Sequence, residues 1–468
     1  MGALGILTVA ALAAEVPAPA PCGPVPTARQ LAWHRMERYA FIHFGPNTFT
    51  DREWGDGAEH PDVFAPTQLD CRQWARVLKG AGFEMIMVTA KHHDGFCLWP
   101  SKFSTHTVAQ SAWRGGKGDV LKELSEACRE QGLRFGVYLS PWDRNHPNYG
   151  TPQYNETFKN MLSEVLTRYG KVSEVWFDGA NGEGPNGKRQ VYDWPGFIAT
   201  VRHCQPGAVI FSDAGPDVRW VGNEAGHSSA TCWSTLRRDE FYPGTPDYAQ
   251  LTEGHKDGTH WVPAECDVSI RPGWFYRGSE DPKVKSLQDL IALYYGSVGQ
   301  NAPLLLNVPP DRRGLLAEPD VAVLEHFGDW LRRTFATNLA KGARVEASNV
   351  RGGARRFAPS NALTERSAYW AADDGVTSAN LTVKLKGASR FDQMRLREAI
   401  ELGQRVERFS IHALVEGGWK QLAEGTTIGW NRIVRFEPVV ASRVRITIEA
   451  AKACPTLRGV GVFLSAPR

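Results

Sequence analysis

Short apolar runs alternate with amphipathic segments along the first two thirds of the chain. Runs rich in β-branched and aromatic residues predict buried parallel strands, and apolar residues at helical spacing predict the helices between them. Residues 213–285 are rich in Gly, Pro, Asp and Trp and contain no clear amphipathic helix. The predicted strands cover 38–45, 84–90, 134–139, 175–178, 208–212 and 303–308; the predicted helices cover 67–80, 119–130, 154–169, 194–204, 286–298 and 319–334.

Repeated strand–helix units favour an α/β fold, a (β/α)8 barrel of the TIM type with an irregular later half. A doubly wound open sheet is the competing fold. No GxGxxG or P-loop motif follows any predicted strand, which removes the commonest ligands of that alternative.

The hydrophobic period changes to two after about residue 338, as in 381–385, 408–414, 444–448 and 460–464. This alternation predicts an all-β sandwich with no major helix. We therefore divide the chain into a signal or spacer segment (1–22), a catalytic barrel (23–337) and a C-terminal sandwich (338–468).

The N-terminal segment 1–22 is rich in Gly, Ala, Leu and Val and ends in a Pro/Ala-rich stretch. It resembles the apolar part of a secretory signal, although no basic residue precedes Arg29. The apolar run is too short to predict a membrane span. We expect export to the periplasm or the medium; the alternative is an N-terminus without a targeting role.

Composition narrows the function classes. The net charge of +3 arises from 54 basic and 51 acidic residues, a balance that argues against a nucleic-acid partner. The 16 Trp suit flat or sugar-like ligands. Eight cysteines without a CxxC pair argue against a zinc ribbon, and leave open one or two disulfides or buried free thiols.

Polar residues gather where the predicted strands end. His43 ends the first strand, His92 and His93 follow the second, Tyr138 ends the third and Asp178 ends the fourth. Each alone has an ordinary structural explanation, such as a turn aspartate or a core histidine. The carboxyl ends of barrel strands meet on one face, so together they predict an active site.

Metal catalysis is not favoured by the spacing of these residues. His92, His93 and Asp94 are adjacent, so strand geometry would send neighbours to opposite faces. No HxH or HExxH motif occurs. We predict no metal and no cofactor, and expect the imidazoles to hydrogen-bond vicinal hydroxyls.

Hydrolysis by paired carboxylates requires a partner for Asp178. Glu224 is distinguished by Trp220 and small residues around it, which predict partial desolvation and a raised pKa; a solvated loop glutamate is the alternative. Arg271 and Trp274, beside Phe275 and Tyr276, suit a sugar with polar and apolar faces. No GxSxG motif is present. The candidate second acids are Glu183, Asp213, Asp217, Glu224 and Glu265.

Five segments together resemble glycoside hydrolase family 29, the α-L-fucosidases. This resemblance implies a retaining hydrolase with Asp178 as nucleophile. It places Arg271 and Trp274 near the ring oxygen and 6-methyl group of fucose. The segments are FIHFG (41–45), EWG (53–55), AKHHDGF (90–96), VWFDG (175–179) and RPGW (271–274). The fucose-binding positions would be His43, Glu53, Trp54, His92, His93 and Tyr138.

The WVGNE run (220–224) resembles the branch that acts on α-1,3/1,4-linked fucose, in which Glu224 would be the acid/base. That branch favours branched, Lewis-type glycans, so the expected partner is a fucosylated oligosaccharide or glycoconjugate. The C-terminal domain resembles galactose-binding-like domains. The alternatives are a broad α-L-fucosidase, another barrel glycosidase, a non-catalytic glycan-binding barrel and a metal-dependent hydrolase.

Overall fold

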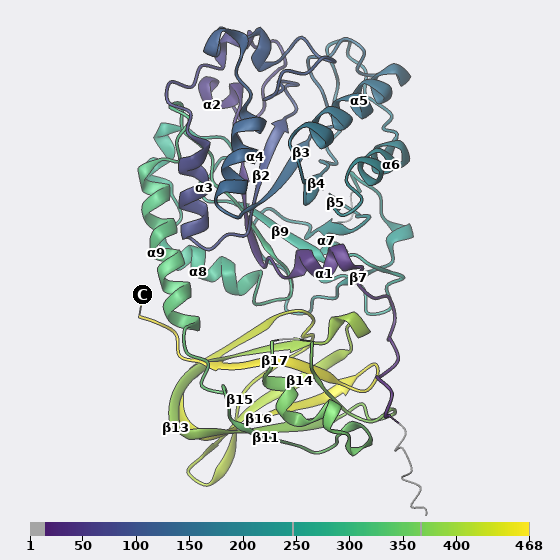
Figure 1. Ribbon diagram of the computed structural model, residues 1–468, viewed down its shortest axis with the longest axis vertical. Coiled ribbons are helices and arrows are strands. Elements are labelled where there is room, and N and C mark those ends of the chain that lie inside the picture. The colour runs from purple at the N-terminus through teal and green to yellow at the C-terminus, as the bar shows by residue number, and fades with distance from the viewer. Residues whose placement is uncertain (1–14, 246–247, 366, 468) are drawn as a thin grey trace, which may run out of the picture.

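The protein consists of two domains stacked along its long axis (Figure 1). The computed structural model describes residues 15–245, 248–365 and 367–467. Most of the predicted signal segment, residues 1–14, lies outside the described residues.

Eight parallel strands close into the predicted barrel, in the order β1-β10-β9-β6-β5-β4-β3-β2. The barrel is closed because β1 pairs with both β2 and β10. This pairing excludes the doubly wound open sheet. The strands are β1 (Arg38–Ile42), β2 (Met85–Lys91), β3 (Arg134–Leu139), β4 (Glu174–Trp176), β5 (Val209–Ser212), β6 (Val218–Trp220), β9 (Ala264–Ser269) and β10 (Leu304–Asn307).

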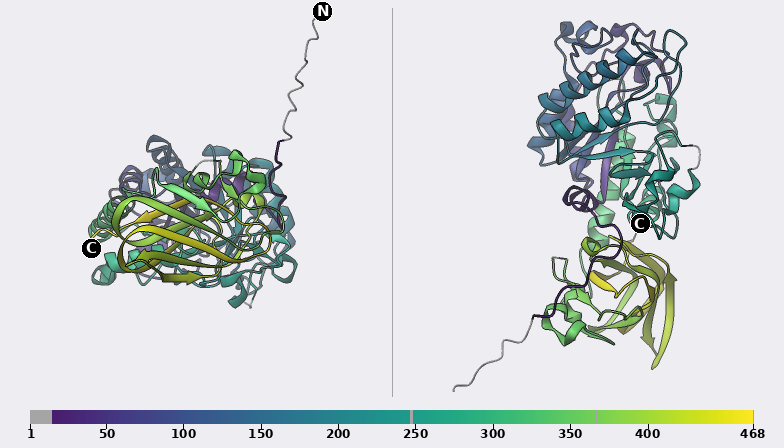
Figure 2. Two further views of the ribbon diagram at one scale, coloured as in Figure 1. Left: turned by 90° about the horizontal axis from the view of Figure 1, so that it is seen from below. Right: turned by 90° about the vertical axis from the view of Figure 1, so that its right-hand side faces the viewer.

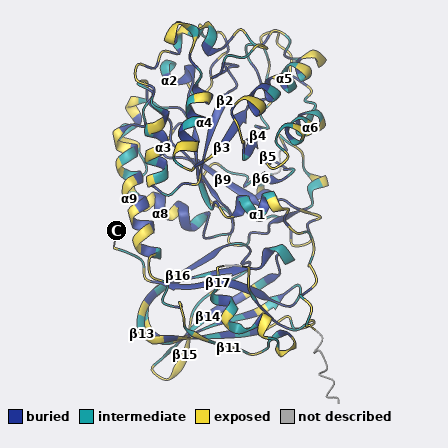
Figure 3. Ribbon diagram, viewed as in Figure 1, coloured by how far each residue is buried: buried dark blue, intermediate teal, exposed yellow. Residues whose placement is uncertain are grey.

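Amphipathic helices cover the outside of the barrel, with exposed outer faces and buried inner faces (Figure 3). In α3, Asp70 caps the helix by accepting hydrogen bonds from two backbone N–H groups, and Trp74 and Leu78 are buried one turn apart. The helices are α1 (Ala28–His34), α2 (Pro46–Thr50), α3 (Cys71–Gly80), α4 (Val120–Glu130), α5 (Pro152–Arg168), α6 (Trp194–Cys204), α7 (Ala249–Glu253), α8 (Leu287–Gly296) and α9 (Glu318–Phe335).

The later half of the barrel is irregular, as predicted. No helix separates β5 from β6, and α7, between β6 and β9, has only five residues. A two-stranded sheet, β7 (Thr235–Leu236) with β8 (His260–Trp261), fills part of the same connection. β6 and β9 were not predicted, because β6 is very short and β9 carries two acidic residues.

Those acidic residues belong to a polar layer inside the barrel. Tyr39 donates a hydrogen bond to Glu265, and the Trp176 indole N–H donates to the same carboxyl group at 2.8 Å. The Trp33 indole N–H donates to Glu174 at 3.0 Å. Burial, and then the neighbouring Glu265, raise the pKa of Glu174 well above its usual range. This layer holds Trp176 in place beneath the carboxyl ends of the strands.

The C-terminal domain is all-β and contains no α-helix among its described residues, as predicted. Two 20-residue strands, β13 and β16, run antiparallel through its full length with register shifts, around one apolar core. The strands are β11 (Arg344–Ala347), β12 (Trp370–Ala371), β13 (Ala379–Glu398), β14 (Val406–Val415), β15 (Gly418–Gly425), β16 (Arg432–Ala451) and β17 (Thr456–Phe463).

Residues 15–22, assigned to the spacer from sequence, lie against the C-terminal domain before the chain enters α1 (Figure 2). Arg351 donates to the Pro17 carbonyl at 2.7 Å, and the buried Arg405 donates to the Ala20 carbonyl at 2.5 Å. This part of the segment is therefore integral to the fold. All eight cysteines lie within the described residues and are free thiols. No helix in the described part of the chain is long and apolar enough to cross a bilayer.

Candidate active site

A small cavity of about 170 Å³ opens at the carboxyl ends of the barrel strands. It brings together nine of the ten residues predicted from sequence, Arg271 being the exception. The lining residues are Phe41, His43, Glu53, Trp54, His92, His93, Tyr138, Trp176, Asp178, Ala180, Glu224, Asp267 and Trp274.

Asp178 follows β4 and is oriented by its neighbours. Its Oδ1 accepts a hydrogen bond from the Ala180 backbone N–H at 2.8 Å, and its Oδ2 accepts one from the Tyr138 hydroxyl at 3.0 Å. Nε2 of His93 lies 3.7 Å from the same Oδ2. The Asp178 side chain remains one quarter exposed and lines the cavity, so its carboxylate is held yet accessible.

Glu224 lies on the loop after β6 and lines the same cavity. The Trp274 indole N–H donates to Glu224 Oε2 at 3.2 Å. Although Glu224 is an exposed residue, the partial burial of its carboxyl group raises its pKa, and the nearby charges of Asp178 and Glu53 add to the increase. The two carboxyl groups therefore occupy unlike environments within one cavity.

The other candidate acids are placed less favourably. Asp217 is buried in ion pairs with Arg29 and Arg202, Glu265 lies inside the barrel, and Glu183 does not line the cavity. Asp213 lines a second, larger groove that shares Asp178 and Glu224 with the cavity, and it accepts a hydrogen bond from the Gly244 N–H at 2.6 Å. Glu224 is the candidate that shares the small cavity with Asp178.

Three buried imidazoles form one wall. Burial lowers the pKa of His43 to about 3 and that of His93 to about 4, and it lowers the pKa of His92 well below the usual range. Neutral rings donate at one nitrogen and accept at the other. Nδ1 of His43 contacts Asn307 Oδ1 at 2.9 Å and Nδ1 of His93 contacts Ser140 Oγ at 2.8 Å. We infer that Nε2 of His43 and Nε2 of His93 are hydrogen-bond acceptors.

The expectation that His92 and His93 point to opposite faces is wrong. β2 ends at Lys91, so strand alternation no longer applies to the residues that follow. The chain turns there, with the Gly95 N–H bonded to the His92 carbonyl, and both rings line the cavity with centroids 4.2 Å apart.

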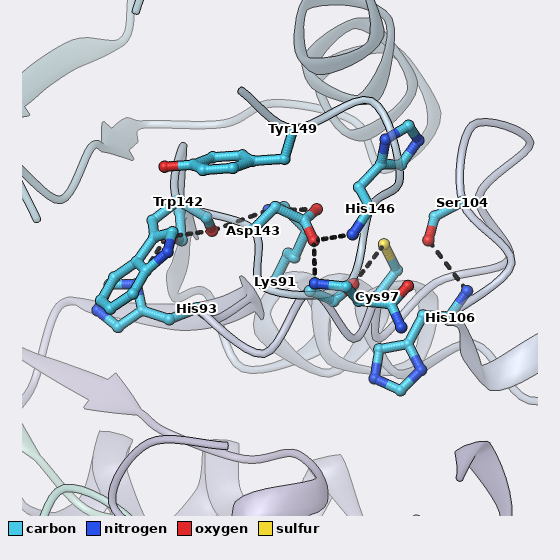
Figure 4. A network of polar contacts seen from close by, with 12 residues as sticks. Lys91, His93, Cys97, Ser104, His106, Trp142, Asp143, His146 and Tyr149 are labelled. Atoms are coloured by element: carbon cyan, nitrogen blue, oxygen red, sulfur yellow. Dashed lines mark hydrogen bonds and ion pairs between the residues drawn. The ribbon is translucent and has the colours of Figure 1, made fainter. Parts of the chain in front are cut away.

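A buried ion pair supports this wall from behind (Figure 4). The Lys91 ammonium group donates to Asp143 at 3.1 Å and to the Trp142 carbonyl at 3.3 Å. The Trp142 ring packs against His93, with centroids 4.8 Å apart. Lys91 thereby joins the end of β2 to the loop after β3, beside His93.

An aromatic and acidic rim completes the cavity. Glu53 accepts a hydrogen bond from the Trp274 backbone N–H at 2.6 Å and pairs with Arg277 at 2.7 Å. Trp274 packs against His43, with centroids 5.0 Å apart. Trp54 is 55% exposed and contacts His93 edge to face. Such a wall suits the apolar face of a sugar.

Arg271 does not reach the cavity, contrary to the position that the family resemblance implied. Its side chain is fully buried, with Asp320 at 2.9 Å and Asp281 at 2.8 Å, and its guanidinium group lies over the Tyr276 ring. Arg271 holds α9 and the loop after β9 together instead of contacting a ligand.

Four lining residues were not predicted: Phe41, Trp176, Ala180 and Asp267. Asp267 is buried in β9 and accepts a hydrogen bond from the Trp220 indole N–H at 2.8 Å. The acidic residues at 265 and 267, two apart, were the signal that this segment is a strand facing the barrel interior. Among the described residues, no group of three His, Cys, Asp or Glu side chains could hold a metal ion.

A closed barrel whose mouth holds two carboxyl groups, neutral imidazoles and an aromatic wall has the architecture of a glycoside hydrolase. Residues 26–334 match the family model for α-L-fucosidase, and residues 344–458 match the F5/8 type C domain. The chain therefore belongs to the α-L-fucosidases of glycoside hydrolase family 29 and is an α-L-fucosidase by family.

Known proteins resemble the chain over both domains. Alpha-L-fucosidase 1 of Arabidopsis thaliana is 43% identical over 96% of this chain and 89% of its own. A glycoside hydrolase 29 family member from an unknown rumen bacterium is 42% identical with a TM-score of 0.84, covering 96% of this chain and 78% of that one. A Ruminococcus gnavus GH29 fucosidase in complex with fucose is 35% identical with a TM-score of 0.89, covering 97% of each.

Asp320→Asn should destabilise the protein by about 3 kcal/mol, because it leaves the buried Arg271 charge without its buried partner. Urea denaturation measures the loss. Asp281→Asn is the matched control, since Asp281 is 39% exposed and its loss should cost less than about 1 kcal/mol. Equal losses in the two variants would contradict the structural role of Asp320.

With Glu224 as the general acid that the sequence predicts, Trp274→Phe should move the basic limb of the kcat/KM profile to higher pH. In the unsubstituted protein, the hydrogen bond from the Trp274 indole N–H lowers the pKa of Glu224. Its removal raises that pKa and keeps the carboxyl group protonated at higher pH. Trp54→Phe is the control, because no hydrogen bond from Trp54 to Glu224 is found. A limb that stays in place or moves to lower pH in Trp274→Phe would contradict this assignment.

Proposed function

We propose that the protein is a retaining exo-α-L-fucosidase that releases terminal fucose by double displacement. Asp178 attacks the anomeric carbon while Glu224 donates a proton to the departing glycosidic oxygen, giving a fucosyl ester of Asp178. Glu224 then takes a proton from water, whose oxygen attacks the anomeric carbon, and Asp178 departs as a carboxylate. Fucose keeps its anomeric configuration, and both carboxyl groups return to their initial states.

The observation that carries this proposal is the contrast between the two carboxyl groups that share the cavity. Asp178 accepts hydrogen bonds at both oxygens, an arrangement that suits an anionic nucleophile. The raised pKa of Glu224 suits a group that must begin the reaction protonated. Formation of the ester removes the charge of Asp178, which lowers the pKa of Glu224 and prepares it to act as the base.

The remaining lining residues suit a small deoxysugar. The Nε2 atoms of His43 and His93 would accept hydrogen bonds from ring hydroxyls. The aromatic rings of Phe41, Trp176 and Trp274 provide an apolar surface that matches a methyl group better than a hydroxymethyl group. This combination favours fucose over galactose, which carries a hydroxyl at carbon 6.

The two acids should respond differently to substitution. Asp178→Asn should lower kcat by more than about 10³-fold on every substrate, because no ester forms. Glu224→Ala should lower kcat/KM on oligosaccharides by about 10²- to 10⁴-fold, and far less on an activated aryl fucoside, whose leaving group needs no proton.

Azide should restore turnover of the aryl fucoside by Glu224→Ala and yield fucosyl azide. Equal losses on both substrates would remove Glu224 from the acid/base role.

We also propose a preference for α-1,3/1,4-linked fucose in branched glycans. A larger groove of about 770 Å³ adjoins the small cavity and shares Asp178 and Glu224 with it. Trp194, Tyr242 and Tyr248 line this groove but not the small cavity, and they supply stacking surfaces for additional sugar rings. A branched aglycone presents two sugars beside the fucose and would use this space more fully than a linear one.

A substrate panel tests this preference. Lewis a and Lewis x trisaccharides should show kcat/KM at least about 10-fold above 2′-fucosyllactose and an aryl fucoside, since one additional set of sugar contacts supplies roughly 1–2 kcal/mol. Fucose release is measured for each substrate at one enzyme concentration. Comparable rates on all four substrates would indicate the broad α-L-fucosidase considered above.

We propose export on the sequence of the N-terminal segment, residues 1–22. Residues 15–22 contact the C-terminal domain, so we expect any cleavage to fall before Glu15. N-terminal sequencing of the protein recovered outside the cytoplasm would locate the processed end. Retention of an unprocessed chain in the cytoplasm would contradict export.

A further inference from the structure

Glu224 is carried by a loop whose two ends meet. Residues 221–232 leave β6 and return to the same place, where Val221 and Cys232 pack in one small buried cluster. Val221 is also fixed to the barrel, because its N–H donates to the Glu265 carbonyl at 3.0 Å. The position of Glu224 therefore depends on what holds both ends of this loop. The cluster consists of Val221, Cys232, Ala264, Cys266 and Ala302.

The tip of the loop is compact. The Asn223 side chain accepts a hydrogen bond from the Ala225 N–H at 3.0 Å and donates to the His227 carbonyl at 3.1 Å. Gly226 has φ +73°, and an added Cβ would lie 2.6 Å from Val268, so the tip packs tightly on the barrel. Because the turn is closed in this way, a displacement of the ends of the loop also displaces Glu224.

The returning end of the loop is bound by the C-terminal domain. The Thr427 hydroxyl accepts a hydrogen bond from the Cys232 N–H at 2.9 Å. The Gln404 side chain accepts one from the Ser234 N–H at 2.7 Å and donates to the Cys232 carbonyl at 2.9 Å. All four residues are buried. Water therefore does not compete for these hydrogen bonds.

Two further contacts hold Ala230, two residues before Cys232. The Ala230 carbonyl accepts hydrogen bonds from the Arg432 guanidinium group at 2.7 Å and from the Thr426 hydroxyl at 3.1 Å. Figure 1 places β7, which begins just after this segment, on the side of the barrel that faces the C-terminal domain. Residues 230–234 thus make consecutive contacts with the second domain.

The contacting part of the C-terminal domain is itself rigid. The Gly429 N–H donates to the buried Glu398 carboxyl group at 2.7 Å, and the Trp430 N–H donates to Asn301 of the barrel at 2.7 Å. The Asn301 side chain in turn donates to the Cys232 carbonyl at 3.1 Å. One network therefore joins the turn after β15, the barrel and the base of the Glu224 loop.

We propose that the C-terminal domain acts as a clamp on the loop that carries Glu224, with Gln404, Thr427 and Arg432 as positioning residues for its carboxyl group. The inference rests on the proposed acid/base role of Glu224. It gives the second domain a part in catalysis that is independent of any glycan that the domain binds. Loss of the clamp lets the base of the loop move, and protonation of the leaving oxygen becomes less efficient.

Thr427→Val and Gln404→Met test the clamp, because each removes hydrogen-bonding groups at nearly constant volume. We expect kcat/KM to fall on the order of 10- to 100-fold on the best oligosaccharide of the panel, and less than about 2-fold on an activated aryl fucoside. A merely structural role would lower both values together. Thermal unfolding followed by circular dichroism verifies that each variant is folded. If one of the two variants does not fold, the other one tests the clamp.

Thr334→Val is the matched control. Its buried hydroxyl accepts a hydrogen bond from the Ala466 N–H at 3.1 Å, on α9 and away from the Glu224 loop, so both substrates should react normally. Equal losses on both substrates, or no loss, in the two clamp variants would overturn the clamp alone. A Glu224→Ala enzyme without leaving-group dependence would overturn the acid/base role and the clamp with it.

Discussion

Closure of eight parallel strands into a barrel is the constraint on which the rest of this structure depends. It brings the residues that follow different strands to one rim, so that His43 and Asp178, 135 positions apart in the sequence, line one cavity. Closure also creates an interior that must be filled. Here hydrogen-bonded Tyr39, Glu265 and Trp176 fill it and form the floor beneath Asp178.

Much of this arrangement could be predicted from the sequence, because strand ends have local signals. Where an apolar run stops at a polar residue, as at His43 or Asp178, the sequence indicates a candidate site residue and places it at the carboxyl end of a strand. β6 and β9 could not be predicted in the same way. Glu265 is polar inside the barrel, Arg219 is buried on the outer face of β6, and the partners of both come from segments that no local pattern reveals.

Arg271 shows a second limit of sequence reasoning. An arginine beside aromatic residues suits a sugar, yet this guanidinium group is bound by Asp320, which lies 49 residues further along the chain. The choice between a ligand and a buried partner depends on tertiary packing. The same holds for the contacts of the C-terminal domain with the Glu224 loop, where Thr427 lies 195 residues from Cys232. Such contacts connect the two domains to the proposed chemistry.

The central claim is that Asp178 becomes covalently bonded to the sugar. The most direct measurement is peptide mapping by mass spectrometry after reaction with a 2-deoxy-2-fluoro-fucosyl fluoride, which forms the ester and slows its hydrolysis. The account predicts one fluorofucosyl group on the peptide that contains Asp178, and none in Asp178→Asn. A label on another carboxylate, or its persistence in Asp178→Asn, would contradict it.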